Sequence, residues 1–115
     1  MQVIFESRDT EGRQFQALAE QRVRFVLRRL NWLVPQASIR LSDVNGPRGG
    51  IDKRCQVEFT TQGNGRIVST AMAADWRAAL EGALSRAARR IIRNVQRSQV
   101  RQRPQARQRP FAADL

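Results

Sequence analysis

Five arginines recur at helical spacing in the stretch GALSRAARRIIRNVQR (82–97): Arg86, Arg89, Arg90, Arg93 and Arg97. At 100° per residue they fall within about 100° of one another and form one stripe along roughly 17 Å of helix. The stripe contains no acid, although charges of one sign repel along a helix. A guanidinium group donates two hydrogen bonds to a phosphate at once, so the pattern favours phosphate binding over a solvated face.

Further basic residues extend this candidate nucleic-acid surface. An earlier helical segment adds a second set: Arg22, Arg24, Arg28 and Arg29. This set would form a basic groove with the stripe if the two helices lie side by side. The glycine-rich loop NGPRGGIDKR (45–54) adds Arg48, Lys53 and Arg54. This loop lacks the P-loop pattern. It either approaches an RNA backbone closely or is a tight connection between strands that needs glycine for its backbone angles.

The charge of the chain points to a polyanionic partner. The 115 residues carry a net charge of +11, and residues 84–115 hold nine arginines and one acid, a net +8. Nucleic acid is the first candidate and an anionic membrane surface the second. The apolar side of the arginine-rich helix is mostly alanine, without the bulky residues that anchor in lipid, so we expect no membrane partner.

Residues for catalysis or metal binding are scarce. The sequence has no histidine, no paired-carboxylate spacing and one cysteine, Cys55, which alternates with Val57 and Phe59 as a buried strand residue would. We therefore expect no enzyme, cofactor, metal site or small-molecule substrate. The polar start and the lack of a long apolar run argue against a signal peptide and a membrane span, and we expect a cytoplasmic protein.

The hydrophobic pattern predicts the elements that position the arginines. Alternating residues indicate strands at 2–6, 38–44, 53–60 and 66–72, with QGNG (62–65) as a hairpin turn. Apolar residues every three or four positions indicate a helix over 13–30, and Asp75 is placed to cap another over 76–97. The order is β-α-β-β-β-α, an α+β fold.

These elements predict a four-stranded sheet with two helices packed on one face and the other face open to solvent. Apolar residues of the second helix lie opposite the stripe and would pack on the sheet: Leu80, Leu84, Ala87, Ala88, Ile91 and Val95. This domain would span 1–97. The near-repeat RQRPQA and RQRPFA predicts that 98–115 is a mostly disordered basic Arg/Gln/Pro tail, which either adds weak, salt-sensitive affinity for nucleic acid or has no role.

The run DWRAALEGALSRAARRIIR (75–93) resembles the second helix of the ribosome hibernation promoting factors, also called ribosome-associated inhibitors or the sigma-54 modulation family. Their pattern is roughly D-M-Y-A-A-I-D, followed by leucines and basic residues at helical spacing. Matching positions here are Asp75, Ala78, Ala79, Leu80, Glu81, Arg86, Arg89 and Arg93. The resemblance covers residues 1–97, including the order of elements.

The resemblance implies a short-form hibernation factor that binds the small ribosomal subunit in the mRNA and tRNA channel and inhibits translation in stationary phase or stress. It implicates Arg22, Arg86, Arg89 and Arg93 in contacts to ribosomal RNA; Arg90 and Arg97 extend the set along the stripe. We expect a monomer off the ribosome. Charge alone fits any phosphate backbone, so a generic RNA- or DNA-binding module not specific to the ribosome stays open.

Overall fold

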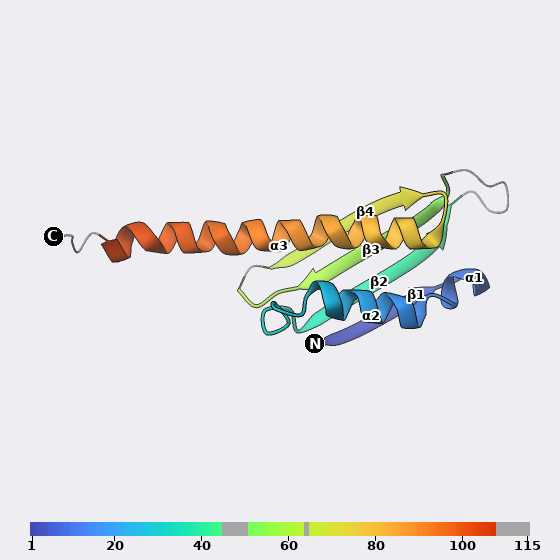
Figure 1. Cartoon of the computed structure of the whole chain (residues 1–115), viewed down its shortest axis with the longest axis horizontal. Helices are drawn as coiled ribbons and strands as arrows, with labels where there is room; N and C mark the ends of the chain where they lie inside the picture. Colours follow the sequence, from blue (N-terminus) through green and yellow to red (C-terminus); the bar gives the residue numbers. More distant parts are fainter. Residues whose placement is uncertain (45–50, 64, 108–115) are drawn as a thin grey trace.

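The structure, a computed structural model, describes residues 1–44, 51–63 and 65–107 (Figure 1). The elements follow the predicted order, with an extra short helix after the first strand: β1 (Gln2–Ser7), α1 (Thr10–Arg13), α2 (Gln16–Val26), β2 (Gln36–Asp43), β3 (Lys53–Thr60), β4 (Arg66–Ala73) and α3 (Trp76–Arg107).

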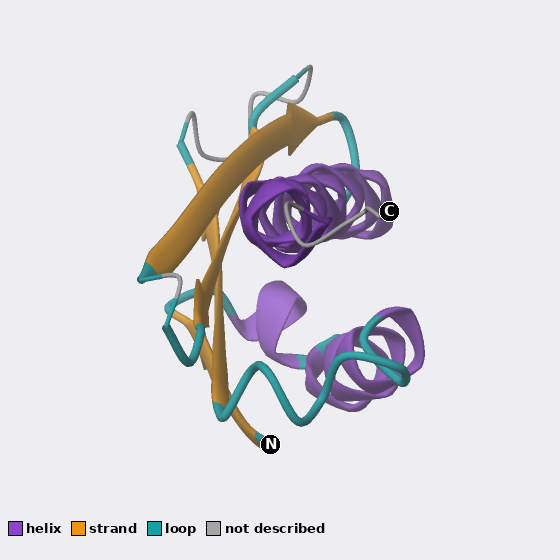
Figure 2. Ribbon diagram, turned by 90° about the vertical axis from the view of Figure 1, so that its left-hand side faces the viewer, coloured by secondary structure: helices purple, strands orange, loops and turns teal. Residues whose placement is uncertain are grey.

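The strands form one sheet in the order β1-β2-β3-β4. The first pair is parallel, because the chain returns through α1 and α2, and the other two pairs are antiparallel. In the β3–β4 turn, Gly63 and Gly65 have φ angles of 85° and 73°, which glycine adopts without strain. Figure 2 shows α2 and α3 on the same face of the sheet, which confirms the predicted α+β architecture.

The core lies between this face and the helices. In β3, Cys55, Val57 and Phe59 are buried, as their alternation predicts. Burial raises the pKa of the Cys55 thiol to about 12, so the nucleophilic thiolate is disfavoured at neutral pH. The residues that the helices bury over the sheet are Ala19, Val23, Ala79, Leu80, Ala83, Leu84, Ala87 and Ile91. Each large aliphatic side chain among them stabilises the fold by about 1.5–3 kcal/mol.

The start of α3 is fixed by two hydrogen bonds. The Oδ1 atom of Asp75 accepts from the backbone N–H of Ala78 at 2.7 Å, which confirms the predicted cap. The indole Nε1 of Trp76 donates to Glu11 Oε1 at 2.8 Å and joins the start of α3 to α1. These contacts set the orientation of the helix that carries the arginine stripe.

The helix predicted over 13–30 forms as α2 but is shorter at both ends, and a separate short helix, α1, precedes it with a turn between them. Gly12 is buried against β1, where an added Cβ would lie 2.3 Å from Ser7 Oγ. The bond from Phe15 N–H to the Gly12 carbonyl, at 3.0 Å, is a tight i→i+3 bond that ends α1. After Val26 the chain continues in turns of the same kind, with Leu30 N–H bonding the Leu27 carbonyl at 2.8 Å.

The predicted end of the second helix at Arg97 is also wrong, because α3 continues to Arg107. Residues 98–107, predicted as part of a disordered tail, are therefore helical. Arginine, glutamine and alanine are good helix formers, and extending a helix whose first turns are already docked carries no nucleation penalty, which offsets the missing N–H donor of Pro104. The rest of the predicted tail, 108–115, lies outside the described residues.

Candidate nucleic-acid interface

An open groove of about 340 Å³ runs between α3 and β4. We call it the edge groove; it is lined by Val68, Ser69, Thr70, Arg86, Arg89, Arg90 and Arg93. All four arginines are exposed, as is Arg97 one turn further along α3. From Leu84 to Arg107 the helix has eight arginines and no acid, so the groove has an uncompensated positive charge. Such a surface attracts phosphate groups.

Two arginines of the edge groove are held by the backbone of β4. Arg86 Nη1 donates to the Thr70 carbonyl at 2.9 Å, and Arg90 Nη1 donates to the Val68 carbonyl. Each guanidinium group has five N–H donors, so four remain for a ligand. Arg89 and Arg93 make no hydrogen bond or ion pair within the described residues, which leaves all their donors available. The groove thus combines two positioned cations with two free ones.

The stripe lies beside the sheet instead of opposite it, which corrects the predicted geometry. Small residues cause the difference: Ala79 and Ala83 are buried, and a Cβ added to Gly82 would lie 3.1 Å from the Cβ of Ala71. These residues let α3 lie close to β4 and turn the arginines toward the strand. The sequence periodicity places the arginines on one side of the helix but leaves the rotation of the helix on the sheet undetermined.

A basic groove between the two helices is not formed, although α2 and α3 lie next to each other (Figure 2). The side of α3 that faces α2 presents Glu81, whose carboxylate accepts from Arg22 Nε at 2.7 Å and Nη2 at 3.1 Å. The hydrogen bonds to Glu81 raise the pKa of Arg22. Arg22 therefore links the helices, and the prediction of one groove built from both sets of arginines is wrong.

The other three arginines of the α2 set are exposed near the end of that helix. Arg24 Nη1 donates to the Met1 carbonyl at 3.3 Å, and Arg28 Nη1 donates to the Phe25 carbonyl at 2.8 Å. The side chain of Arg29 makes no hydrogen bond within the part of the chain that the structure describes. These residues form a second basic surface, separate from the edge groove.

Part of the glycine-rich loop, including Arg48, lies in 45–50, outside the described residues. Lys53 begins β3, and its Nζ lies 2.9 Å from Asp43 Oδ2 and 3.3 Å from Asp52 Oδ1. The hydrogen bond to Asp43 raises the pKa of Lys53, and its side chain is only 14% exposed. Lys53 is thus held inside the domain, which corrects its predicted contact to RNA. Arg54 lies on the open face of the sheet, away from the helices.

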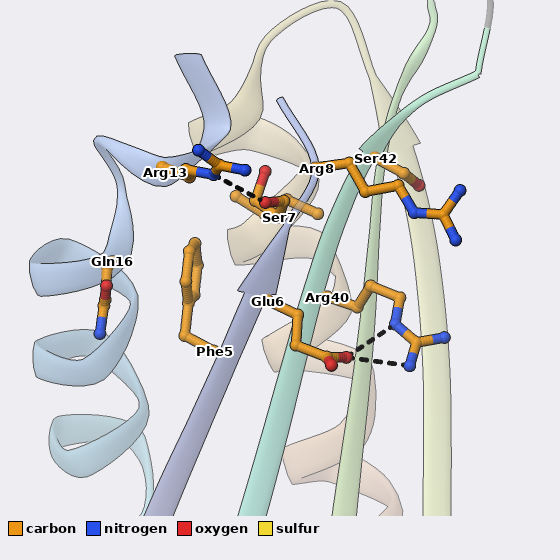
Figure 3. A pocket seen from close by; sticks show the side chains of 9 residues that line it. Phe5, Glu6, Ser7, Arg8, Arg13, Gln16, Arg40 and Ser42 are labelled. Atoms are coloured by element: carbon orange, nitrogen blue, oxygen red, sulfur yellow. Dashed lines mark hydrogen bonds and ion pairs between the residues drawn. The ribbon is translucent and has the colours of Figure 1, made fainter. Parts of the chain in front are cut away.

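The sequence pattern did not identify a third arginine cluster, at the end of β1 (Figure 3). Arg8, Arg13 and Arg40 line a pocket of about 710 Å³, but they come from three segments without a common periodicity. Arg40 Nη2 is paired with Glu6 Oε1 at 2.9 Å. Figure 3 shows Arg13 on one side of β1 and the other two on the opposite side. The three cations do not converge on one point, so the edge groove is the stronger phosphate site.

None of the helices in the described residues is both long enough and apolar enough to cross a membrane.

No protein-family model matches this sequence, and no curated protein matches it. Among solved structures, the chain is similar to the crystal structure of the Thermus thermophilus Protein Y N-terminal domain, with a TM-score of 0.57 and 21% sequence identity. The match covers 81% of this chain and 98% of that one. The likeness confirms the fold implied by the DWRAALEG resemblance: this chain has the fold of the Protein Y N-terminal domain.

Proposed function

We propose that this domain is a hibernation-type inhibitor of translation that binds the small ribosomal subunit in the channel used by mRNA and tRNA. The edge groove contacts phosphates of ribosomal RNA through Arg86, Arg89, Arg90 and Arg93, and Arg97 extends the contact along α3. On the other helix, Arg24, Arg28 and Arg29 contact the RNA. Binding occurs in stationary phase or under stress, when translation is to be stopped.

The edge groove is the observation that carries the proposal. It presents four exposed arginines with no acid among its described lining residues, and two of them are already oriented by the backbone of β4. The fold gives independent support, because the Protein Y N-terminal domain has a ribosome hibernation-type fold. The spacing of arginines in 75–93 matches the same family.

The mechanism is occlusion by shape and charge. Guanidinium groups that contact phosphates position a protein on RNA without reading its base sequence. The folded RNA surface of the channel supplies the specificity, because its phosphates must match the spacing of the arginines. A domain seated there fills space that mRNA and the anticodon stem of tRNA would occupy.

Co-sedimentation with purified small subunits tests this proposal. The protein should pellet with empty subunits, and subunits loaded with mRNA and tRNA should bind it much more weakly, because the ligands share the channel. Binding that is undisturbed by mRNA and tRNA would contradict occlusion.

A parallel titration with random duplex DNA at physiological salt tests the alternative of a generic nucleic-acid-binding module. We expect the small subunit to bind at least about 100-fold more tightly than the duplex, within the usual range for specific over non-specific binding. Comparable affinities would replace the proposed function with the generic one.

A further inference from the structure

Two large aromatic side chains are exposed at the end of α2, among the arginines of that helix. Phe25 is 52% exposed and Trp32 is 65% exposed, although both could contribute to a core. Arg28 and Arg29 lie between them, with Phe25 four residues from Arg29 and Arg28 four residues from Trp32, along the end of α2 and the turns after it. Contacts link them in two pairs, Arg28 with Phe25 and Trp32 with Arg29. We call Phe25, Arg28, Arg29 and Trp32 the α2 platform.

Local contacts hold the α2 platform in place. The guanidinium of Arg28 lies 4.2 Å from the centre of the Phe25 ring, and that of Arg22 lies 5.3 Å from it. The indole Nε1 of Trp32 donates to the Arg29 carbonyl at 3.2 Å. The Trp32 ring is thus oriented by its polar edge while most of its surface stays open. An ordered, exposed ring loses little conformational entropy when a flat ligand stacks on it.

The charge around the rings indicates which ligand fits. Three arginines of this region, Arg24, Arg28 and Arg29, make no ion pair within the described residues, whereas Arg22 is paired with Glu81. A patch that binds an apolar protein surface would not need a uniform cationic border. An unpaired nucleotide matches both the aromatic rings and the arginines, because its base stacks on an aromatic ring and its phosphate pairs with arginine.

We infer that the α2 platform binds single-stranded RNA, with an unpaired base stacked on Trp32 and the adjoining phosphates paired with Arg28 and Arg29. This inference deepens the proposed function and rests on it for the source of the RNA. It assigns a different chemistry to the second basic surface: the edge groove contacts only phosphates, whereas the α2 platform recognises an exposed base.

The two tryptophans of the chain allow a direct test, since Trp76 is only 3% exposed. In the Trp76→Phe variant, Trp32 is the only indole, and its emission reports the platform alone. A single-stranded oligoadenylate RNA of about eight nucleotides should quench this emission through stacking. The same RNA in a blunt duplex has no unpaired base and should leave the emission unchanged. The Trp32→Phe variant, which keeps Trp76, should show no quenching.

Affinities provide the second measurement. Trp32→Ala should weaken binding of the single strand at least about fivefold, and Trp32→Phe, which keeps an aromatic face, should weaken it less. The thermal transition should stay the same, because the side chain is exposed. Equal quenching by the duplex, or unchanged affinity in Trp32→Ala, would overturn the inference. A blue shift with anionic lipid vesicles and no response to the single strand would overturn it in favour of a membrane contact.

Co-sedimentation with small subunits separates this inference from the proposed function. If the wild-type protein pellets with subunits while Trp32→Ala binds equally well and Trp32 is not quenched, the platform is wrong and the proposed function stands. If single-stranded RNA quenches Trp32 but the wild-type protein does not pellet with subunits, the platform stands and the proposed function is wrong.

Discussion

The edge groove and the α2 platform both present arginines from a helix, but different neighbours hold those arginines. In the edge groove, Arg86 and Arg90 bond to carbonyl groups of β4, and the groove has no aromatic side chain. In the α2 platform, Arg28 stacks on Phe25, and the exposed Trp32 bonds to the Arg29 carbonyl. The edge groove offers a ligand only positive charge, whereas the α2 platform offers positive charge and a flat apolar surface.

The difference shows that net charge does not define what a basic surface binds. Phosphate contacts release counterions and weaken steeply with salt, whereas base stacking depends little on salt. The neighbours of each arginine therefore predict how the two surfaces respond to substitution and to ionic strength.

The largest effect is expected from Arg89→Glu together with Arg93→Glu. Loss of two charge-assisted contacts and repulsion of phosphate should weaken binding to small subunits at least about 100-fold. Neither arginine has a partner within the described residues, so the thermal transition should barely move. Equilibrium binding and a melting curve on the same sample test both points.

A matched control for this variant is Arg8→Glu with Arg77→Glu, which changes the charge equally outside the edge groove, at exposed arginines without a hydrogen bond or ion pair within the described residues. Arg77 lies in the first turn of α3, where an acid is favourable. The control should keep most of the affinity. Equal losses in both variants would mean that total charge, and not the groove, determines binding.

The second largest effect is expected in the salt dependence of binding, which should differ between the edge groove and the α2 platform. Replacing Arg89 and Arg93 with glutamine should reduce the slope of log affinity against log salt by about 1.4–1.8, since each phosphate contact contributes about 0.7–0.9. Trp32→Ala should lower affinity without changing the slope. Titrations at four salt concentrations measure both slopes. A reduced slope in Trp32→Ala would show that the platform also acts through charge alone.

A smaller effect is expected at the ion pair that joins the two helices. Glu81→Gln should lower the free energy of unfolding by about 0.5–1 kcal/mol, as for a partly exposed pair. It should also raise the affinity for RNA about twofold to fivefold, because Arg22 is released. Arg22→Gln breaks the same pair without releasing a cation, so it should lose stability and gain no affinity. An affinity gain in both variants would exclude Arg22 as its source.

The last effect concerns the stability of the core that both surfaces share. The folded domain retains the Cys55 proton up to a pKa of about 12, whereas the ordinary value is 9.0. The unfolded chain therefore releases this proton first, and the free energy of unfolding falls as the pH rises above about 9. At about pH 9.5 the loss relative to neutral pH is on the order of 1 kcal/mol.

Urea titrations at the two pH values measure this loss, and Cys55→Ala should lack the contribution of the thiol. RNA binding by the edge groove and the α2 platform should decline together as the domain unfolds. An equal loss of stability in Cys55→Ala would assign the effect to another group.

The strands were predictable because their pattern is local. Cys55, Val57 and Phe59 alternate with polar residues, and β3 has the predicted bounds 53–60. The start of α3 was equally clear from Asp75 and its hydrogen bond to Ala78. Both features depend on residues within one element, which periodicity and capping rules describe directly.

The features that sequence reasoning missed depend on contacts between distant segments. The partner of Arg22 is Glu81, 59 residues away, so no local pattern indicates that Arg22 is occupied. The break after α1 comes from the packing of Gly12 on β1, and the stripe turns toward β4 because Gly82 lets α3 approach Ala71. The candidate arginines were identifiable as a set, but their division into two surfaces requires the fold.

The bonds from Arg86 and Arg90 to β4 also affect how the free protein behaves at high concentration. β4 is the last strand of the sheet, and the carbonyl groups of Val68 and Thr70 lie on its outer edge. An uncovered edge of this kind is a template for pairing with a second chain and leads to aggregation. The two guanidinium groups cover these carbonyls with like charges that repel another copy. We therefore expect the arginines of the edge groove to hinder edge-to-edge pairing of the free protein as well.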